Sequence, residues 1–160
     1  MYCIFDFFIY FCSERTDEIP PTVGFNIKTF RAGRYSVNVW DVGGQKSIRS
    51  FWRNYFDTTD GLIWVVDSSD KRRLLDCKSE LEILLREERL SGSSLLILAN
   101  KQDLPDSLSV SEIASILDLD RIKQNRNCAV FPCSVFDKSS ITIGFDWIIN
   151  DIGNRMYLLR

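Results

Sequence analysis

Apolar and polar positions alternate in two neighbouring stretches of the chain, and this pattern predicts a β-hairpin. Residues 25–30, FNIKTF, alternate in character, and RAGR follows with Gly33 at a turn position. In residues 35–41, YSVNVWD, alternate positions place apolar side chains on one face, at Tyr35, Val37 and Val39. Two alternating runs joined by a short glycine-containing turn are typical of paired antiparallel strands.

Three short runs later in the chain predict strands, and the first two are apolar enough to predict strands that are buried in the sheet. They are Gly61–Asp67 (GLIWVVD), residues 95–99 (LLILA) and residues 128–133 (CAVFPC). Runs with few polar positions are typical of parallel strands, because helices pack against both faces of a parallel sheet.

The segments between and after these runs have apolar residues at helical spacing. Residues 71–90 form one amphipathic helix that stops before Gly92, with an apolar side made by Leu74, Cys77, Leu81, Leu84 and Leu85. Ser109 or Ser111 caps a helix that runs to Leu117. Residues 143–158 form a last helix whose inward side holds Phe145, Trp147, Ile148 and Ile152. This alternation predicts an α/β fold, a mostly parallel sheet with helices on both faces.

Composition narrows the classes of function. The chain has 160 residues, which suits a single domain over residues 1–160, and its net charge of −2 gives no sign of a nucleic-acid-binding surface. It contains no histidine, which excludes catalytic schemes built on that residue. The cysteines are odd in number and form no CxxC pair, so we expect small buried thiols in a reducing compartment: Cys3, Cys12, Cys77, Cys128 and Cys133.

The first 12 residues, MYCIFDFFIYFC, are almost continuously apolar. They are too short for a membrane span of ~20 residues. They also lack the basic start and the cleavage site of a secretory signal, and Asp6 interrupts them. We therefore interpret residues 1–12 as a buried strand or helix.

Ligands of parallel α/β sheets bind beyond the carboxyl ends of the strands. In this chain the strands are followed by DVGGQ at residues 41–45, DSSD at 67–70, NKQD at 100–103 and CSV at 133–135. Three of these four stretches have side chains that suggest a chemical role.

The NKQD stretch has the chemistry to bind guanine. The carboxylate of Asp103 can accept hydrogen bonds from N1 and the exocyclic amine of guanine, a donor pair that adenine lacks. The stem of Lys101 can lie over the base, and Asn100 can tie neighbouring loops together. Four residues can also occur by chance, and the alternative is a polar turn ahead of Pro105.

The DVGGQ stretch has the chemistry to meet a phosphate. Gly43 and Gly44 allow a backbone N–H to approach an oxygen without a Cβ in the way. Asp41 can hold a magnesium-bound water, and Gln45 can orient an attacking water. In PTVGFN, residues 21–26, the hydroxyl of Thr22 can bind Mg²⁺. Taken singly, both stretches could be ordinary turns.

Together and in this order, PTVGFN, WDVGGQKSIRSFWRNYF and NKQDLP resemble signatures of the ADP-ribosylation-factor (Arf) group of small GTPases. The resemblance covers residues 11 to 156, and IWVVDSSD, LLREERLSG and ANKQDLP are similar to its Arf-like members. It implies the P-loop NTPase, Ras-like GTPase fold.

The resemblance assigns roles to single residues. Thr22 would bind magnesium and the γ-phosphate, Gly44 would donate to the γ-phosphate, and Gln45 would position the hydrolytic water. The guanine-binding residues would be Asn100, Lys101 and Asp103. Ser134 and Val135 would lie in the last loop that contacts the base. Val135 stands where the family usually has alanine. The aromatic residues that such proteins present to effectors would be Phe25, Trp40 and Tyr55, although each could also be plain core.

The resemblance does not extend to the start of the chain. No G-x-x-x-x-G-K-[ST] motif occurs in the 160 residues, and GQKS at residues 44–47 has an extra residue between Gly and Lys. We therefore expect the family's phosphate-binding loop and first strand to be missing or replaced by residues 1–12. That segment would fill the empty strand position or form a helix against the sheet. Without a central strand, two neighbouring strands would have open apolar edges.

The leading prediction is a cytoplasmic GTP/GDP-binding switch that uses Mg²⁺, with GTP hydrolysis as in the intact family. Its partners would be guanine nucleotide and effector proteins, including tubulin-folding factors, with no nucleic acid. We expect no stable membrane anchor, because Tyr2 stands where acylated relatives have glycine. The alternative is a truncated, non-enzymatic isoform or an incorrect gene prediction, which keeps the effector face and binds nucleotide weakly or not at all.

Overall fold

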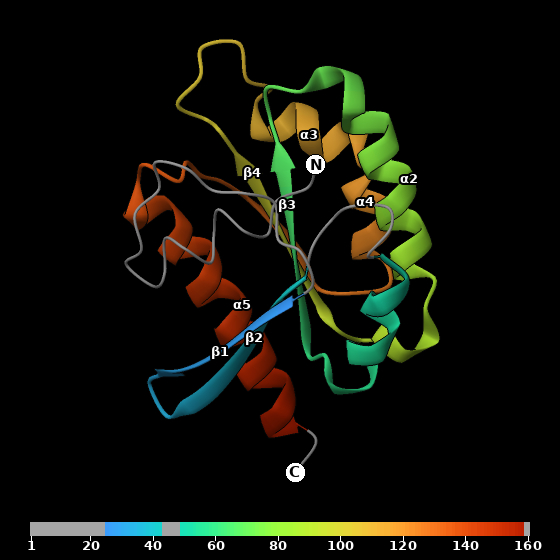
Figure 1. Cartoon of the computed structure of the whole chain (residues 1–160), viewed down its shortest axis with the longest axis vertical. Coiled ribbons are helices and arrows are strands. Elements are labelled where there is room, and N and C mark those ends of the chain that lie inside the picture. The colour runs from blue at the N-terminus through green and yellow to red at the C-terminus, as the bar shows by residue number, and fades with distance from the viewer. Residues whose placement is uncertain (1–24, 43–48, 159–160) are drawn as a thin grey trace. The chain divides into compact units, whose positions relative to one another are not determined.

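The computed structural model describes residues 25–42 and 49–158, and residues 1–24, 43–48 and 159–160 lie outside this description. The chain divides into two compact units between Asn54 and Tyr55. We call them the hairpin unit and the sheet unit and describe each by itself (Figure 1). The single-domain assignment and the role of residues 1–12 stay predictions.

The hairpin unit contains the predicted antiparallel pair. Strand β1 (Phe25–Ala32) pairs with strand β2 (Tyr35–Val42), so that Ala32 faces Tyr35 next to a two-residue turn. Gly33 in that turn has φ +58°, a conformation that glycine adopts without steric cost. Alternate residues of β2 are exposed and half-buried, as the sequence pattern predicted.

The sheet unit contains three parallel strands in the order β3–β4–β5. They are β3 (Gly61–Asp67), β4 (Ser94–Asn100) and β5 (Cys128–Pro132). All seven residues of β4 are buried. The predicted α/β fold is confirmed, with the parallel strands in one sheet and the described antiparallel strands in another.

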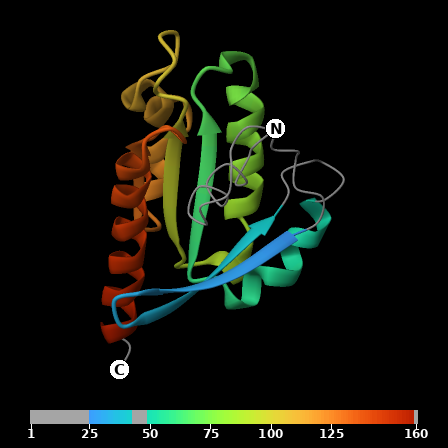
Figure 2. The same cartoon turned by 60° about the vertical axis from the view of Figure 1, so that its left-hand side comes forward.

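Helices cover both faces of the parallel sheet. Figure 2 shows α5 (Lys138–Leu158) on one side of β3 and β4, with α2 (Leu74–Leu85) on the other. The remaining helices are α3 (Val110–Ile116), α4 (Leu119–Lys123) and the 3₁₀ helices η1 (Arg49–Thr58), η2 (Lys71–Arg73) and η3 (Glu88–Leu90). None of the helices in the described residues combines the length and apolar character needed to span a bilayer.

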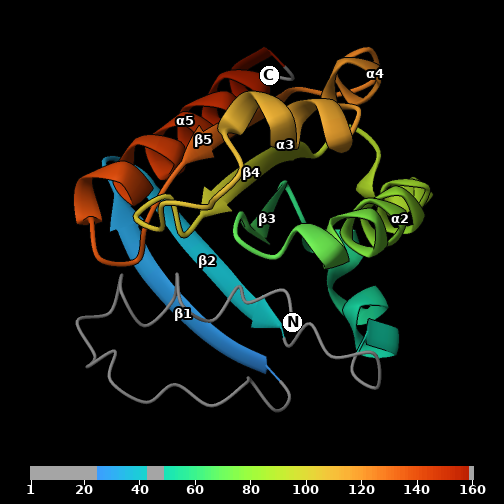
Figure 3. The ribbon, with the colours of Figure 1, turned by 90° about the horizontal axis from the view of Figure 1, so that it is seen from above.

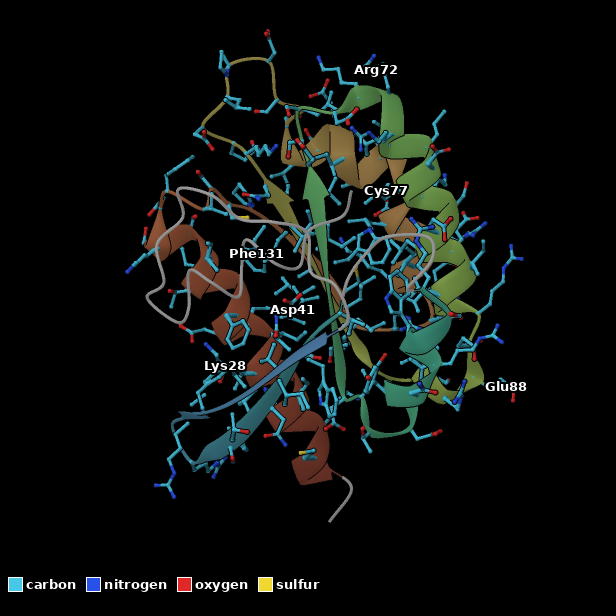
Figure 4. All side chains as sticks on the ribbon, in the orientation of Figure 1. Lys28, Asp41, Arg72, Cys77, Glu88 and Phe131 are labelled. Carbon is cyan, nitrogen blue, oxygen red and sulfur yellow. The ribbon has the colours of Figure 1, made fainter. Side chains whose placement is uncertain are left out.

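Close packing fixes both helices against the sheet. On the α5 side, a Cβ added to Gly144 would lie 2.9 Å from Cδ2 of Leu98, so the helix backbone approaches β4 at this point. On the α2 side, the indole N–H of Trp64 donates to Sγ of Cys77 at 3.1 Å. Cys77 is buried and forms no disulfide, and it is labelled on α2 in Figure 4. Cys133 is also buried outside any disulfide, and burial raises the pKa of its thiol to about 12.

Arg155 joins α5 to the amino ends of the strands. Its guanidinium donates to the carbonyl oxygens of Gly92 and Asp60, the latter at 2.7 Å, and to Oγ of Ser94 at 2.9 Å. Ser94 in turn donates to the carboxylate of Asp151, one turn before Arg155 on α5. This polar cluster therefore lies at the opposite end of the sheet from the carboxyl ends of the strands.

The single helix predicted for residues 71–90 is wrong. The α-helix ends at Leu85, Glu87 is extended at φ −68° and ψ 119°, and η3 follows. Arg126 donates to the carbonyl oxygen of Leu85 at 3.4 Å, which provides a partner for one of the helix's last carbonyls. The break also brings Leu90 into the core, where it is fully buried.

Two other helix predictions need correction. Helix α5 begins at Lys138 and not at residue 143, because the carboxylate of Asp137 accepts bonds from the N–H and hydroxyl of Ser139. Helix α4 follows Asp118, which has φ +57° and ends the preceding helix. Neither α4 nor η1 was predicted. Ser109, by contrast, is confirmed as the cap of α3, through a capping box with Glu112.

Candidate functional site

The carboxyl ends of β3, β4 and β5 form one edge of the sheet unit. Figure 3 views this edge from above, and the strand pairing places Asp67 beside Asn100, and Ala99 beside Pro132. The predicted convergence of the strand ends is therefore confirmed within the sheet unit. The site is built from the loops that leave these three strands.

An oriented carboxylate lies at the centre of this edge. The hydroxyl of Ser134 donates to Oδ1 of Asp103 at 2.6 Å and accepts from the backbone N–H of Phe136 at 3.2 Å. A turn fixes Ser134 itself, because the N–H of Asp137 donates to its carbonyl at 2.9 Å. Ser134 is buried, whereas Asp103 is exposed. The arrangement presents a carboxylate of fixed orientation to solvent.

Asn100, the last residue of β4, ties the loops together as predicted. The side chain is buried, and its Oδ1 accepts from the backbone N–H of Lys101 at 2.8 Å and from Sγ of Cys133 at 3.8 Å. Its backbone carbonyl accepts from the N–H of Ser68 at 3.0 Å. One residue therefore links the ends of all three parallel strands.

Lys101 has an unusual backbone conformation and a definite partner. Its φ is +68°, a region that few residues other than glycine occupy. Its Nζ lies 2.8 Å from Oδ2 of Asp67, with side chains 41% and 31% exposed. Oδ1 of Asp67 accepts from the N–H and the hydroxyl of Ser69, at 3.0 and 2.6 Å. Partial burial raises the pKa of Asp67, but the hydrogen bonds from Lys101 and Ser69 outweigh it, so the pKa is lowered overall.

Gln102 stabilises the loop after β4 through hydrogen bonds of its backbone and its side chain. Its backbone N–H donates to the carbonyl of Cys133 at 3.1 Å. Its side-chain amide donates to Oγ of Ser68 and to the carbonyl of Leu108, both at 2.9 Å. The segment between Asn100 and Leu108 is therefore held at both ends.

The structure brings together the predicted residues of β4 and β5. Val135 lies half-buried in the turn after Ser134, so five of the predicted residues share this edge: Asn100, Lys101, Asp103, Ser134 and Val135. None of these five lines the open depression of about 500 Å³ that is bounded by Asp67, Ser69, Asp70, Lys71, Arg72 and Asp106. Arg72 is labelled at its position in Figure 4.

The other predicted residues lie elsewhere or outside the described residues. Asp41 is buried near the end of β2, with Oδ2 3.5 Å from the amide of Asn26 (Figure 4). Phe25 begins β1, and Trp40 on β2 is 37% exposed opposite Ile27, which is 46% exposed. Tyr55 lies in η1. Thr22, Gly44 and Gln45 fall outside the described ranges.

Sequence reasoning missed the residues that support the site. Asp67, Ser69 and Gln102 were not predicted as site residues, although Asp67 ends a predicted strand and Gln102 lies inside the NKQD stretch. Asp67 pairs with Lys101, and Gln102 donates to Ser68, so these two contacts join segments more than 30 residues apart and only the fold shows them. In residues 25–42 and 49–158, no three side chains of His, Cys, Asp or Glu gather as a metal-binding cluster.

Comparisons with known proteins agree with this geometry. A profile of the ADP-ribosylation factor family matches residues 8–152. Arf-like protein 2 of Arabidopsis thaliana is 56% identical over 146 residues, covering 91% of this chain and 79% of that protein. Arf-like protein 2 of Drosophila melanogaster is 52% identical over 149 residues, covering 93% of this chain and 80% of that protein.

A solved structure supports the same assignment. The Arl6 (BBS3) small GTPase from Trypanosoma brucei, with a bound nucleotide analogue, GppNp, matches with a TM-score of 0.81 and 32% identity. The match covers 93% of this chain and 91% of that one. It confirms the predicted Ras-like GTPase fold, and the relatives confirm the resemblance to the Arf-like members of the family. The chain therefore belongs to the ADP-ribosylation factor family of small GTPases.

Proposed function

We propose that this chain is a guanine-nucleotide-binding switch that holds the base at the carboxyl edge of its parallel sheet. The observation that carries the proposal is the hydrogen bond of 2.6 Å from Ser134 to Asp103. It orients an exposed carboxylate beside three strand ends, where ligands of such sheets bind. The family membership of the chain supports the same function.

The carboxylate of Asp103 would select guanine by its hydrogen-bonding pattern. Guanine offers two adjacent donors, N1–H and the 2-amino group, and a carboxylate offers two acceptors. Adenine has no donor pair there, so its binding would leave Asp103 without a partner on the base. An unmet acceptor of this kind costs about 1–3 kcal/mol, and more when it is charged. The stem of Lys101 would flank the base, and Val135 would lie in the loop beside it.

The phosphates of the nucleotide would be bound by residues that the resemblance assigns. Gly44 would donate a backbone N–H to the γ-phosphate, and Gln45 would orient the water for hydrolysis. Thr22 and Asp41 would hold Mg²⁺, to which the buried carboxylate of Asp41 at the end of β2 is suited. When bound, Mg²⁺ would neutralise phosphate charge.

The hairpin would carry the effector surface. Ile27 and Trp40 form an exposed apolar pair across β1 and β2. The resemblance also assigns Phe25 and Tyr55 to effector binding, and aromatic residues are enriched in protein interfaces. By family resemblance the partners would be effector proteins, including tubulin-folding factors, met in the cytoplasm.

A second candidate function rests on one sequence observation. The 160 residues contain no G-x-x-x-x-G-K-[ST] motif. A phosphate-binding loop contributes several charge-assisted hydrogen bonds, each worth roughly 1.5–3 kcal/mol. The 160-residue polypeptide would then bind nucleotide weakly and act as a non-enzymatic module through its hairpin.

Replacement of one carboxylate tests the leading proposal. In Asp103→Asn the amide donates where the carboxylate accepted, so the 2-amino group of guanine loses its partner and the 2-oxo group of xanthine gains one. We expect GDP affinity to fall by about 10–100-fold and xanthosine diphosphate affinity to rise. Calorimetric titration with Mg²⁺ present measures both affinities.

A matched control is Asp106→Asn, the same change at an exposed carboxylate in the same loop. It should leave both affinities unchanged. If the wild-type chain binds neither GDP nor GTP at millimolar concentration, the non-enzymatic module is favoured. If Asp103→Asn keeps the wild-type preference for guanine, the assignment of the base site is wrong.

A further inference from the structure

We propose that Asp67 is a positioning residue for the guanine site, holding Lys101 in the conformation in which its stem flanks the base. The inference rests on the proposed function and deepens it, because it gives a role in base binding to a residue at the end of β3. Ser69 supports Asp67 in this role, because it donates hydrogen bonds to the Asp67 carboxylate.

The backbone of Lys101 has a conformation that its surroundings must hold. Its φ of +68° is unfavourable for a residue with a Cβ, so the surrounding structure must hold it there. The side chain of Asn100 does so by accepting from the N–H of Lys101 at 2.8 Å. The side chain of Lys101 therefore leaves the end of β4 in a set direction.

The far end of the side chain needs its own partner. A lysine stem has four rotatable bonds, so its ammonium group would sample many positions if nothing bound it. Oδ2 of Asp67 lies 2.8 Å from Nζ of Lys101 and removes that freedom. With both ends fixed, the methylene stem spans from the end of β4 to the end of β3.

Asp67 is itself oriented for this task. One oxygen, Oδ1, accepts from both the N–H and the hydroxyl of Ser69, at 3.0 and 2.6 Å. The other oxygen is thereby directed to Lys101. The two oxygens of the carboxylate have separate partners, one local and one on the neighbouring strand.

The ion pair between Asp67 and Lys101 is too exposed to add much to the stability of the fold, so we infer that it serves to position Lys101. Its side chains are 41% and 31% exposed, and ion pairs this open to water contribute little to the free energy of folding. Lys101 is also two residues from Asp103, which would bind the edge of the base. While Asp103 binds the edge of the base, the methylene stem of Lys101, held across the strand ends, would provide an apolar surface against the face of the base.

Asp67→Asn is the sharpest test, because asparagine has the same shape. Its carbonyl oxygen can still accept from Ser69, but its amide cannot accept from an ammonium group. We expect the affinities for guanosine and for GDP to fall by the same factor, about 5–20-fold, with an unchanged melting temperature. The ¹⁵N NMR signal of the Lys101 ammonium group, sharp in the wild type, should broaden or vanish.

A double mutant shows whether Asp67 acts through Lys101. Lys101→Met should weaken guanosine binding by about as much as Asp67→Asn, and the double variant should be no weaker than Lys101→Met alone. Asp70→Asn is the matched control, because Asp70 lies in the same loop but pairs with Arg73 at 2.7 Å. It should bind guanosine and GDP like the wild type.

The outcomes separate this inference from the proposed function. If the wild-type chain binds neither guanosine nor GDP, the proposed function fails and the inference fails with it. If the wild type binds and Asp67→Asn binds equally well, or its effect adds to that of Lys101→Met, only the inference is overturned. Should Asp67→Asn not fold, Ser69→Ala decides, with an expected loss of about 2–4-fold in guanosine affinity.

Discussion

A serine hydroxyl decides the orientation of the carboxylate at the candidate base site. Ser134 is buried and bonded on both sides, donating to Asp103 and accepting from the N–H of Phe136. An exposed aspartate without such a partner would rotate freely. The fixed hydroxyl therefore reduces the entropy that ordering of the carboxylate would cost on binding.

Removal of this hydroxyl tests its importance. In Ser134→Ala, Asp103 loses its donor and the N–H of Phe136 loses its acceptor. We expect GDP affinity to fall by about tenfold, because hydrogen bonds to charged groups contribute roughly 1.5–3 kcal/mol. Ser91→Ala, an exposed serine after η3, is the control and should bind like the wild type. Equal affinity of both variants would contradict a role for Ser134.

The roles of some single residues at the candidate site could be predicted from the sequence. Asn100 and Asp103 stand out because a buried strand ends in polar side chains, and the fold brings them beside Ser134 as predicted. The ion pair between Asp67 and Lys101 could not be predicted. It depends on which strands are neighbours and on a backbone angle of Lys101, and no local pattern in the sequence specifies either.

Packing of α5 on β4 depends on Gly144, because this glycine has no side chain that would hold the helix away from the strand. Gly144 is buried, and an added Cβ would lie 2.9 Å from Cδ2 of Leu98 and 3.4 Å from Cδ1 of Leu96. Both leucines are fully buried, so they have little room to move away. The contact between helix and strand is therefore set by this glycine.

The change Gly144→Ala separates two opposing effects. Alanine favours a helix over glycine by about 1 kcal/mol, whereas overpacking a core costs about 1–3 kcal/mol. We expect net destabilisation of about 1 kcal/mol, measured as a lower urea midpoint by circular dichroism. Asn154→Ala, at an exposed position of the same helix, should leave the midpoint unchanged or raise it slightly. A more stable Gly144→Ala variant would mean that Leu98 moves easily.

Elements with a strong apolar pattern were predicted better than their ends. The bounds of β3 follow the run GLIWVVD without error. The start of α5 was missed because Ser139, Ser140 and Thr142 favour helices weakly, and Asp137 compensates with a cap. Helix α2 was extended too far because apolar spacing continues to Leu90, although the chain turns to bury that residue.

At the scale of the whole molecule, acid should weaken the fold. The hydroxyl and N–H of Ser109 lower the pKa of Glu112, and those of Ser139 do the same for Asp137. The pKa of Asp67 is lowered as well. A carboxyl group whose pKa is lower in the folded state contributes stability above its unfolded pKa, and that contribution is lost as pH falls through the folded value.

We therefore expect the urea midpoint to be constant between pH 7 and pH 5 and to fall below about pH 4. Repeating the titration in 0.5 M salt is the control, because salt screens general charge repulsion but leaves these local hydrogen bonds in place. Glu112→Gln should show a shallower decline than the wild type. A midpoint that stays level down to pH 3 would contradict the prediction.

The burial of strand β4 determines how its backbone amides exchange with solvent. All its residues are buried, and it pairs with β3 on one side and β5 on the other. Its amide protons can meet solvent only if a large part of the sheet unit opens. In deuterium oxide, peptides from β4 should consequently take up label last, and their uptake should report global unfolding while the loops beyond the strand ends exchange within seconds.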